Sequence, residues 1–475
     1  MEIEELPEEA PKASLARENL LEEAQRAASS GTVDGKKVVS IVVIGHVDAG
    51  KSTLMGRLLY EVGRLDEKTK RANERGSLKA GKSSFSWAWG LDGTTEERQR
   101  GITMDIAQQF FSTPHRQITV LDAPGHKDFV PNMISGASQA DCALLVVDAA
   151  TGEFEAGFER GGQTREHVLL VRSLGVSQII VAVNKLDQVE WSQARYNEIE
   201  STLRPFLAQS GFTASKTSFV PMGAMLGVNL VGREGEDAKQ LNEWYSGPTL
   251  VDRLDKMEPP KRDYANFFRL PISNIFKTQS TSNVYITGRI AGGIVQVGEK
   301  VRAMPGDDSV VGVVKSIEVE DAPVNWAMAG TNVTVGLTNI DPISLNIGSV
   351  LCFPDEAMPL ATVFTARIIV FDITVPITSG ASVELFNQSR DVPATTSKLL
   401  SLIDRATGEV KKKNPRVLTK NVSAEVEISL RGAGSSIGTK GVPLEPFSVN
   451  KDIGRILLRR GGETIAAGIV LEILG

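Results

Sequence analysis

A glycine-rich segment between a strand and a helix constrains the fold of this chain more than any other feature. The segment GHVDAGKS, Gly45 to Ser52, follows the apolar run VVIG and precedes STLMGRLLYEV, whose apolar spacing is typical of a helix. This context turns a match to GxxxxGK[ST] into a phosphate-binding loop. In such a loop the backbone curls at Gly45 and Gly50 so that its N–H groups point at phosphates, Lys51 reaches the β and γ phosphates, and the Ser52 hydroxyl ligates Mg²⁺.

The loop therefore predicts a set of nucleotide contacts. The candidate residues are Gly45, His46, Val47, Asp48, Ala49, Gly50, Lys51, Ser52 and Thr53. Thr53 would add a contact to the α-phosphate, whereas the His46 side chain is more simply explained as structural.

Alternating strands and helices surround this loop. From Val38 to about Glu258 the strand-like runs VVSIVVIG, ITVLDAPG, CALLVVDA, IIVAVNK and SFVPMG alternate with helix-like segments. This order predicts an α/β fold with a parallel sheet that is covered on both faces. Such folds bind ligands beyond the carboxyl ends of their strands, and every motif described below falls at one of those ends.

The pattern changes after the paired prolines Pro259 and Pro260, which indicate a linker. Short β-branched segments then alternate with Gly, Asp and Asn turns, which predicts two closed β-barrels. We expect four parts: a tail at 1–37, the α/β domain at 38–258, and barrels at 263–357 and 358–475. In the tail, the apolar residues Leu15, Leu20, Leu21 and Ala24 allow one short amphipathic helix, and both a mobile linker and a helix docked on the next domain stay open.

Composition narrows the class of protein. A net charge of −6 argues against general electrostatic coating of nucleic acid, so any RNA contact must be local. No apolar run approaches the roughly 18 residues of a membrane span, and the acidic N-terminus does not resemble a secretory signal. Cys142 and Cys352 each lie in an apolar, strand-like run, so we expect two buried thiols and a reducing compartment.

The segment NKLD, Asn184 to Asp187, identifies the base. The Asp187 carboxylate can accept hydrogen bonds from both the ring N–H and the exocyclic amine of guanine, a pair of donors that adenine lacks. Asn184 would brace the loop, and the stem of Lys185 would pack along the base. The chain is therefore expected to bind GTP and GDP.

Two further segments predict a γ-phosphate sensor. In DAPGH, Asp122 is placed to hold Mg²⁺ through water, the Gly125 N–H can bond the γ-phosphate, and His126 can orient the attacking water. In RGIT, the Thr103 hydroxyl can complete the coordination of Mg²⁺. Ile102 together with Val47 could form an apolar gate that holds His126 away from the water until a partner opens it.

The last guanine-contacting loop departs from the usual pattern. SFVPMGAM offers Gly223 and Ala224 where a serine with a small neighbour is usual, and Met225 follows. The Ala224 N–H can still donate to the guanine carbonyl oxygen. Loss of the serine hydroxyl is expected to weaken the bracing of the loop, so nucleotide is expected to exchange readily.

These motifs, in this order and followed by two barrels, resemble the translational GTPases related to elongation factor 1-alpha and elongation factor Tu across about residues 38–475. Within that group, the chain looks like the ribosome-rescue GTPase that partners Pelota in the segments KSSFSWAWGLDGTTEERQRGITMDI, LDQVEWSQARYNEI, TGEVKKKNPRVLTK and GGETIAAGIVLEIL. The group usually carries a small helical domain ahead of the linker. None is visible here, so we expect this sequence to be a truncated form.

The resemblance implies that the GTP-bound protein carries Pelota, a release-factor relative, to the empty A site of stalled ribosomes in the cytoplasm, as part of ribosome rescue and no-go decay. Contacts with rRNA near the GTPase centre are implied too, and the run Lys411 to Lys413 is either an RNA or Pelota contact or a solvated loop. Elongation factors show HTxH where this chain reads NQSRDV, 387–392, so binding of aminoacyl-tRNA is not expected.

Three alternatives stay open on the sequence. Two are close relatives in function: a release-factor GTPase and an elongation factor that carries aminoacyl-tRNA. The third belongs to another class, the GTPase subunit of a sulfate-activating enzyme, which shares the motifs and the barrels.

Overall fold

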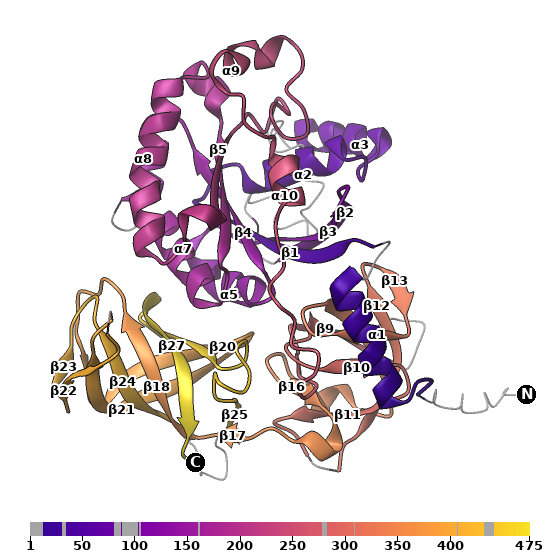
Figure 1. The fold of residues 1–475 in the computed structure, drawn as a ribbon, viewed down its shortest axis with the longest axis vertical. Helices are drawn as coiled ribbons and strands as arrows, with labels where there is room; N and C mark the ends of the chain where they lie inside the picture. The colour runs from indigo at the N-terminus through magenta and orange to yellow at the C-terminus, as the bar shows by residue number, and fades with distance from the viewer. Residues whose placement is uncertain are drawn as a thin grey trace, which may run out of the picture. The chain divides into compact units, whose positions relative to one another are not determined.

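The computed structural model describes residues 13–30, 35–79, 87, 103, 106–159, 162–277, 283–307, 309–405, 407–431 and 441–475. The chain forms two compact units (Figure 1). One unit spans 30–260, and the other combines 1–29 with 261–475. The first unit carries the predicted nucleotide motifs and the second is rich in β-strands.

A six-stranded sheet organises the unit 30–260, with the strand order β2-β3-β1-β4-β5-β6. Neighbouring strands from β3 to β6 run parallel, and β2 joins the edge antiparallel to β3. The strands are β1 (Lys37–Ile44), β2 (Ala107–Ser112), β3 (Arg116–Asp122), β4 (Cys142–Asp148), β5 (Gln178–Asn184) and β6 (Thr217–Pro221). The parallel α/β sheet expected from the sequence is thus present, with one antiparallel edge strand that the apolar runs did not reveal.

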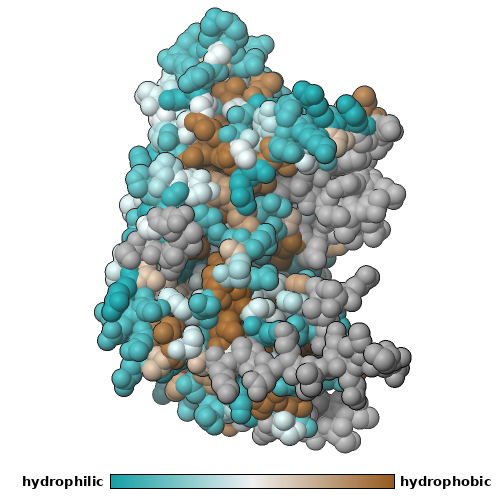
Figure 2. Space-filling model, turned by 90° about the vertical axis from the view of Figure 1, so that its right-hand side faces the viewer, coloured by the Kyte–Doolittle hydropathy of each residue, from teal (hydrophilic) through white to brown (hydrophobic). Residues whose placement is uncertain are grey.

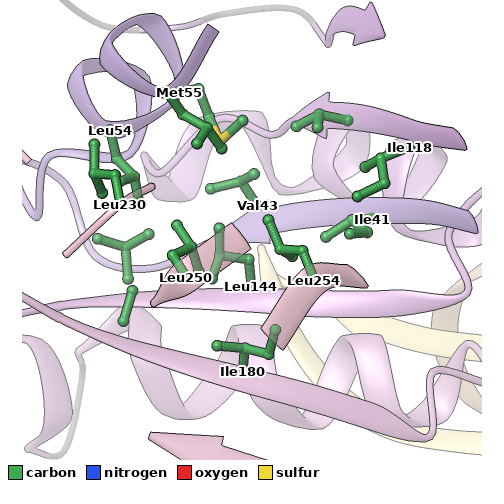
Figure 3. Close-up of a cluster of buried hydrophobic side chains, with 14 of the residues drawn as sticks. Ile41, Val43, Leu54, Met55, Ile118, Leu144, Ile180, Leu230, Leu250 and Leu254 are labelled. Carbon is green, nitrogen blue, oxygen red and sulfur yellow. The ribbon is translucent and has the colours of Figure 1, made fainter. Parts of the chain in front are cut away.

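Helices cover this sheet. The α-helices that the structure describes in this unit are α2 (Lys51–Glu61), α3 (Glu67–Lys79), α5 (Val130–Ser138), α6 (Glu153–Phe158), α7 (Gln163–Ser173), α8 (Gln193–Gln209), α9 (Lys239–Trp244) and α10 (Leu250–Asp255). Leu54 of α2 and Leu254 of α10 pack with Val43 of β1 in one apolar cluster (Figure 3). Val42 and Ile44, which point to the other face of the pleated strand, are buried as well. Both faces are therefore covered, as a parallel sheet requires.

The first β-rich part of the other unit packs around its own core, which includes Phe268, Ile286 and Val335. Its main sheet has the order β7-β16-β11-β12-β15-β9-β8, and β10 pairs separately with β14. The strands are β7 (Leu270–Pro271), β8 (Asn274–Lys277), β9 (Val284–Arg289), β10 (Ile294–Gln296), β11 (Lys300–Met304), β12 (Gly312–Val319), β13 (Ala322–Val324), β14 (Trp326–Met328), β15 (Asn332–Thr338) and β16 (Val350–Cys352). This part is the first barrel.

The second barrel closes on itself, because β20 pairs with both β26 and β21 in the order β20-β26-β27-β18-β24-β21-β22. Its core includes Phe364, Leu385 and Val426. The strands are β17 (Leu360–Ala361), β18 (Val363–Val370), β19 (Ile377–Thr378), β20 (Ala381–Asn387), β21 (Arg390–Ile403), β22 (Val410–Lys413), β23 (Val417–Leu418), β24 (Ser423–Leu430), β25 (Val442–Pro443), β26 (Arg455–Arg460) and β27 (Glu463–Ile473). Closure satisfies the backbone groups that an open sheet would expose along its edges.

A buried ion pair joins the two barrels. The guanidinium of Arg269, next to β7, contacts the carboxylate of Glu445 at 2.8 Å, and both side chains are almost fully buried. Arg269 also donates to the carbonyl oxygens of Phe268 and Glu356. A buried charge is tolerated only when it is paired and hydrogen-bonded, so these contacts tie the barrels together.

The N-terminal segment forms helix α1 (Arg17–Ser30), which packs on the first barrel. Leu20 is fully buried against Ile294 and Met328. The Gln296 side chain accepts a hydrogen bond from the Leu15 N–H at 3.1 Å and donates one to the Leu15 carbonyl oxygen at 2.9 Å. The amphipathic spacing in the tail thus belongs to a helix whose partner is a barrel.

Other expectations concern the surface and the cysteines. Among the residues that the structure describes, none of the helices has the length and apolar character needed to cross a membrane. On the face drawn in Figure 2, hydrophobic side chains form separate patches among hydrophilic ones. Cys142 and Cys352 are both buried and form no disulfide with each other, which confirms the prediction of two buried thiols.

Candidate nucleotide-binding site

The loop between β1 and α2 has a backbone that only glycine can adopt at two points. Gly45 has a φ of 148° and Gly50 a φ of 89°, a region that L side chains rarely adopt. A Cβ atom on Gly45 would lie 2.2 Å from the Val146 carbonyl oxygen, and one on Gly50 would lie 2.6 Å from Asn184 Nδ2. The loop is therefore held close to the ends of β4 and β5, where the other motifs lie.

Lys51 supplies a buried cation at the start of α2. Its Nζ donates to the carbonyl oxygens of Gly45 at 3.1 Å and His46 at 2.7 Å. Burial lowers the pKa of Lys51 to about 8, although the Asp122 and Asp48 carboxylates oppose the shift. A Cβ atom on Gly125 would lie 2.3 Å from this Nζ, so a side chain there would have to displace the lysine from its present position. A buried ammonium beside a helix N-terminus is suited to an anionic ligand such as a polyphosphate.

Three side-chain oxygens meet beside Lys51. Ser52 Oγ donates to Asp122 Oδ2 at 2.8 Å and lies 3.0 Å from Thr103 Oγ1. These residues come from α2, the end of β3 and the segment before β2, and Asp122 is almost fully buried. Hydroxyl and carboxylate oxygens are the ligands that Mg²⁺ prefers, so the donor set fits this ion.

Asn184 and Lys185 link three loops. Asn184 Nδ2 donates to the Ala49 carbonyl oxygen at 2.9 Å, and Asn184 Oδ1 accepts from the Ala224 N–H at 3.0 Å. Lys185 Nζ donates to the Asp48 carbonyl oxygen at 2.6 Å. The bracing role expected of Asn184 therefore has a geometric basis: one side chain holds the phosphate loop and the last guanine loop together.

Asp187 lies opposite this last loop. Burial raises the pKa of its carboxyl above the usual value. A Cβ atom on Gly223 would lie 2.9 Å from Asp187 Oδ1, so the two loops are in close contact. The Ala224 N–H, for which donation to guanine was expected, donates to Asn184 here, and that expected role stays a prediction. Met225, the next residue, is 41% exposed.

His126 follows Gly125 after the end of β3. Its Nδ1 lies 3.4 Å from Asp128 Oδ2, and its ring centroid is 6.1 Å from that of Phe129. The side chain is partly exposed, which leaves it accessible to water. The gate proposed for Ile102 and Val47 is not tested, because Ile102 lies outside the described residues.

The side chain of His46 packs inside the protein behind the phosphate loop. A Cβ atom on Gly157 of α6 would lie 3.1 Å from His46 Cβ, so the histidine packs closely on that helix. A small pocket behind the phosphate loop is lined by His46, Val47, Ala49, Val147, Asp148, Glu153, Phe154, Gly157 and Thr164. This packing supports the structural explanation of the His46 side chain.

Two residues that support the site were missed by the sequence reasoning. Asp148 ends β4, and its carboxylate pairs with Lys185 Nζ at 2.6 Å. Arg195 of α8 donates to the carbonyl oxygens of Ala149 at 2.9 Å and Ala150 at 3.2 Å. Asp148 could have been found as a polar residue at the carboxyl end of an apolar strand. Arg195 gave no comparable signal, because only the fold brings it to this loop.

Comparison with protein families agrees with this arrangement. Residues 36–260 match the elongation factor Tu GTP binding domain, 283–352 match elongation factor Tu domain 2, and 363–471 match the GTP-eEF1A C-terminal domain-like family. Together these matches cover the α/β unit and both barrels.

Individual relatives extend over nearly the whole chain. Protein HBS1 of Drosophila melanogaster is 44% identical over 97% of this chain and 67% of its own length. Elongation factor 1-alpha of Hyperthermus butylicus is 40% identical over 92% of this chain and 97% of its own length. The crystal structure of the GTP-bound Ski7 GTPase-like domain of S. cerevisiae has the same fold, with a TM-score of 0.71 at 20% identity over 91% of this chain and 97% of that one.

Proposed function

Because the chain belongs to the translational GTPase family of elongation factor 1-alpha and elongation factor Tu, and so binds and hydrolyses GTP, we propose that its GTP-bound form carries Pelota to stalled ribosomes. Within the family it is similar to protein HBS1. The observation that carries the proposal is this identity of 44% over 97% of the chain, together with the segments that resemble the Pelota-partnering GTPase. The work would take place in the cytoplasm, at the empty A site.

Asp187 selects guanine in this proposal. Its carboxylate accepts from the two donors on the edge of the base, and the contacts of Asn184 and Lys185 with the phosphate loop fix the distance between base and phosphate sites. Lys185 is also paired with Asp148, which orients its stem for packing along the base. Adenine offers no matching pair of donors, so ATP would leave the partly buried carboxylate without them.

The triphosphate lies along the phosphate loop. Lys51 neutralises charge on the β and γ phosphates, and the loop N–H groups from Gly45 to Thr53 donate to their oxygens. Ser52 and Thr103 would hold Mg²⁺ directly and Asp122 through water, and the bound ion would supply positive charge to the phosphate oxygens. The gathering of their three oxygens supports this assignment.

Thr103 and Gly125 report the γ-phosphate. Each can bond this group with a backbone N–H, so loss of the phosphate releases both loops and the surface that they form with Pelota. His126 orients the attacking water once the ribosome corrects its position, and each tenfold in rate corresponds to about 1.4 kcal/mol of barrier. Hydrolysis thereby times the departure of the factor.

The second barrel supports Pelota as the cargo in place of aminoacyl-tRNA. Where elongation factors show the HTxH pattern, Asn387 Nδ2 donates to the carbonyl oxygens of Ile453 at 2.7 Å and Arg455 at 2.9 Å. Gln388 Nε2 donates to the Asp452 carbonyl oxygen at 2.8 Å. These amides bond the segment that leads into β26 of the same barrel, and no histidine occurs in 387–392.

Affinity capture tests the cargo. The protein is immobilised with a non-hydrolysable GTP analogue or with GDP, and offered purified Pelota and aminoacyl-tRNA in competition. We expect Pelota to be retained with the analogue and lost with GDP, because only the γ-phosphate orders both switch loops. Retention of aminoacyl-tRNA alone would identify an elongation factor, and retention of a release factor in preference to Pelota would identify the release-factor GTPase.

Hydrolysis assays test the activator. GTP turnover should be slow for the free protein and rise sharply with ribosomes plus Pelota, while His126→Ala should bind GTP normally and lose the stimulated rate. Stimulation by an adenylyltransferase instead of ribosomes would favour the sulfate-activating alternative.

A further inference from the structure

The loop beyond Asp187 carries a tryptophan with an unusual backbone and little exposure. Glu190 and Trp191 both have a φ of 53°, a left-handed conformation that non-glycine residues adopt rarely. The Trp191 residue is 6% exposed, and its backbone N–H donates to the Leu186 carbonyl oxygen at 2.8 Å. Such a backbone persists only where the surroundings hold it in place, which points to a use for this side chain.

One further hydrogen bond holds the Trp191 backbone, and two contacts order the residues around it. Its carbonyl oxygen accepts from the indole Nε1 of Trp244 at 2.9 Å. The ring of Trp244 lies 5.3 Å from that of Tyr196, measured between centroids. Ser192, the next residue, caps α8 by accepting from the Arg195 N–H at 3.2 Å. Trp191 is thus anchored on both sides by the elements that follow the Asp187 loop.

The Trp191 ring reaches the position where this chain lacks the usual serine. A Cβ atom on Gly223 would lie 3.0 Å from Trp191 Cη2 and 2.9 Å from Asp187 Oδ1. Gly223 is not among the residues with positive φ, so the crowding by Asp187 and Trp191, and not the backbone conformation, would oppose a side chain there, and both neighbours would have to shift to admit one. The indole edge occupies the volume beside Asp187 that a serine side chain would need.

We propose that Trp191 is a positioning residue for guanine recognition: its ring replaces the missing serine side chain at position 223 and holds the Asp187 carboxylate in place for the base. The inference rests on the proposed role of Asp187. It reverses the expectation that the glycine only weakens the loop, since Asn184 braces the loop through Ala224 and both the indole and the Asp187 carboxylate approach position 223. Removal of the ring would admit water and mobility around Asp187.

A double-mutant cycle tests the exchange of ring for serine. The rate of GDP dissociation is measured for the wild type, Trp191→Ala, Gly223→Ser and the double variant, with a fluorescent GDP displaced by excess GDP. Each single variant should release GDP about tenfold faster, the first by loosening Asp187 and the second by overpacking. In the double variant the rate should return to within about threefold of the wild type, because the serine then has room.

Controls separate positioning from folding and from the role of Asp187. Gly232→Ser is the matched control, because a Cβ atom there meets nothing within 4 Å, and it should leave the rate unchanged. Trp191→Phe, which keeps an aromatic ring, should lie between the wild type and Trp191→Ala. The preference for GDP over inosine diphosphate, which lacks the exocyclic amine, should fall in Trp191→Ala and vanish in Asp187→Ala.

Two results would overturn the inference. If Gly223→Ser slows or speeds release equally in both backgrounds, the ring and the serine do not compete for one volume. If Trp191→Ala keeps the wild-type preference for GDP while Asp187→Ala loses it, Trp191 does not position the carboxylate. A preference that survives in Asp187→Ala would instead refute the proposed reading of the base by Asp187.

Discussion

At the scale of single residues, we expect Lys51 to make nucleotide binding depend on pH. Its pKa in the folded protein is about 8, below its ordinary value of 10.5, because it is buried. Below the lower value the lysine is charged in both the folded and unfolded states, and the cost of burying the charge is fully present. Between about pH 8 and 10.5 this lysine is still protonated in the unfolded chain but largely deprotonated in the folded one. The unfolded state therefore holds more protons, and this group makes the nucleotide-free fold more stable as the pH rises.

Phosphates bound beside Lys51 should reverse this preference, since they would stabilise the charged lysine. Above about pH 8, binding must therefore take up a proton, and affinity for GDP should fall by up to tenfold per pH unit. Calorimetry in two buffers of different ionisation enthalpy should show uptake of nearly one proton at about pH 9 and almost none at about pH 7. In Lys51→Arg the charge is fixed, so only the ionisation of guanine itself should contribute. Equal proton uptake by the two proteins would contradict the prediction.

Residues of the site differ in how far the sequence reveals them. Gly45, Gly50 and Lys51 were predicted together because one local motif specifies the loop, and the close approaches of the glycines explain why no other residue fits. Asp148 and Trp191 were not predicted. Asp148 pairs with Lys185, which is distant in sequence, and the left-handed backbone of Trp191 leaves no mark in the sequence pattern. Periodicity and spacing report local structure, and such contacts exist only in the fold.

At the scale of elements, α1 illustrates the same limit. The apolar spacing of Leu20 and Ala24 predicts an amphipathic helix, but amphipathicity does not name a partner. The partner is an apolar surface formed by Ile294 and Met328 on strands β10 and β14. The antiparallel edge strand β2 was likewise missed, because its sequence AQQFFS has one fully buried residue and no continuous apolar run.

Docking of α1 can be tested through Leu20. Leu20→Ala should destabilise the helix contact by about 2–5 kcal/mol, the usual cost of emptying a buried leucine site, up to the full docking energy of the helix. Hydrogen exchange of residues 17–30 should then become much faster, while the affinity for GDP stays unchanged. Gln25→Ala, at an exposed position on the same helix, is the control and should not change the exchange. Unchanged protection in Leu20→Ala would show that the Gln296 contacts suffice to hold the helix.

At the scale of the whole molecule, the chain combines a nucleotide-binding unit with a pair of barrels, and each has its own cores. The proposed nucleotide-binding residues all belong to the first unit, so a bound nucleotide should stabilise that unit and leave the other unchanged. The barrels, in turn, are joined by the buried pair of Arg269 and Glu445, both of which belong to the second unit. Bound nucleotide and the Arg269–Glu445 pair should therefore change the stability of the two units separately.

Scanning calorimetry should therefore resolve two transitions. GDP at about 100 times its dissociation constant should stabilise one of them by about 2.7 kcal/mol. Arg269→Ala should lower only the other, by about 3–5 kcal/mol, because Glu445 is left buried without its partner. The double replacement Arg269→Met with Glu445→Leu should lose less, since it leaves no unpaired charge. A single transition that both GDP and Arg269→Ala shift would mean that the two units unfold as one, and the separation of binding from barrel stability would then be wrong.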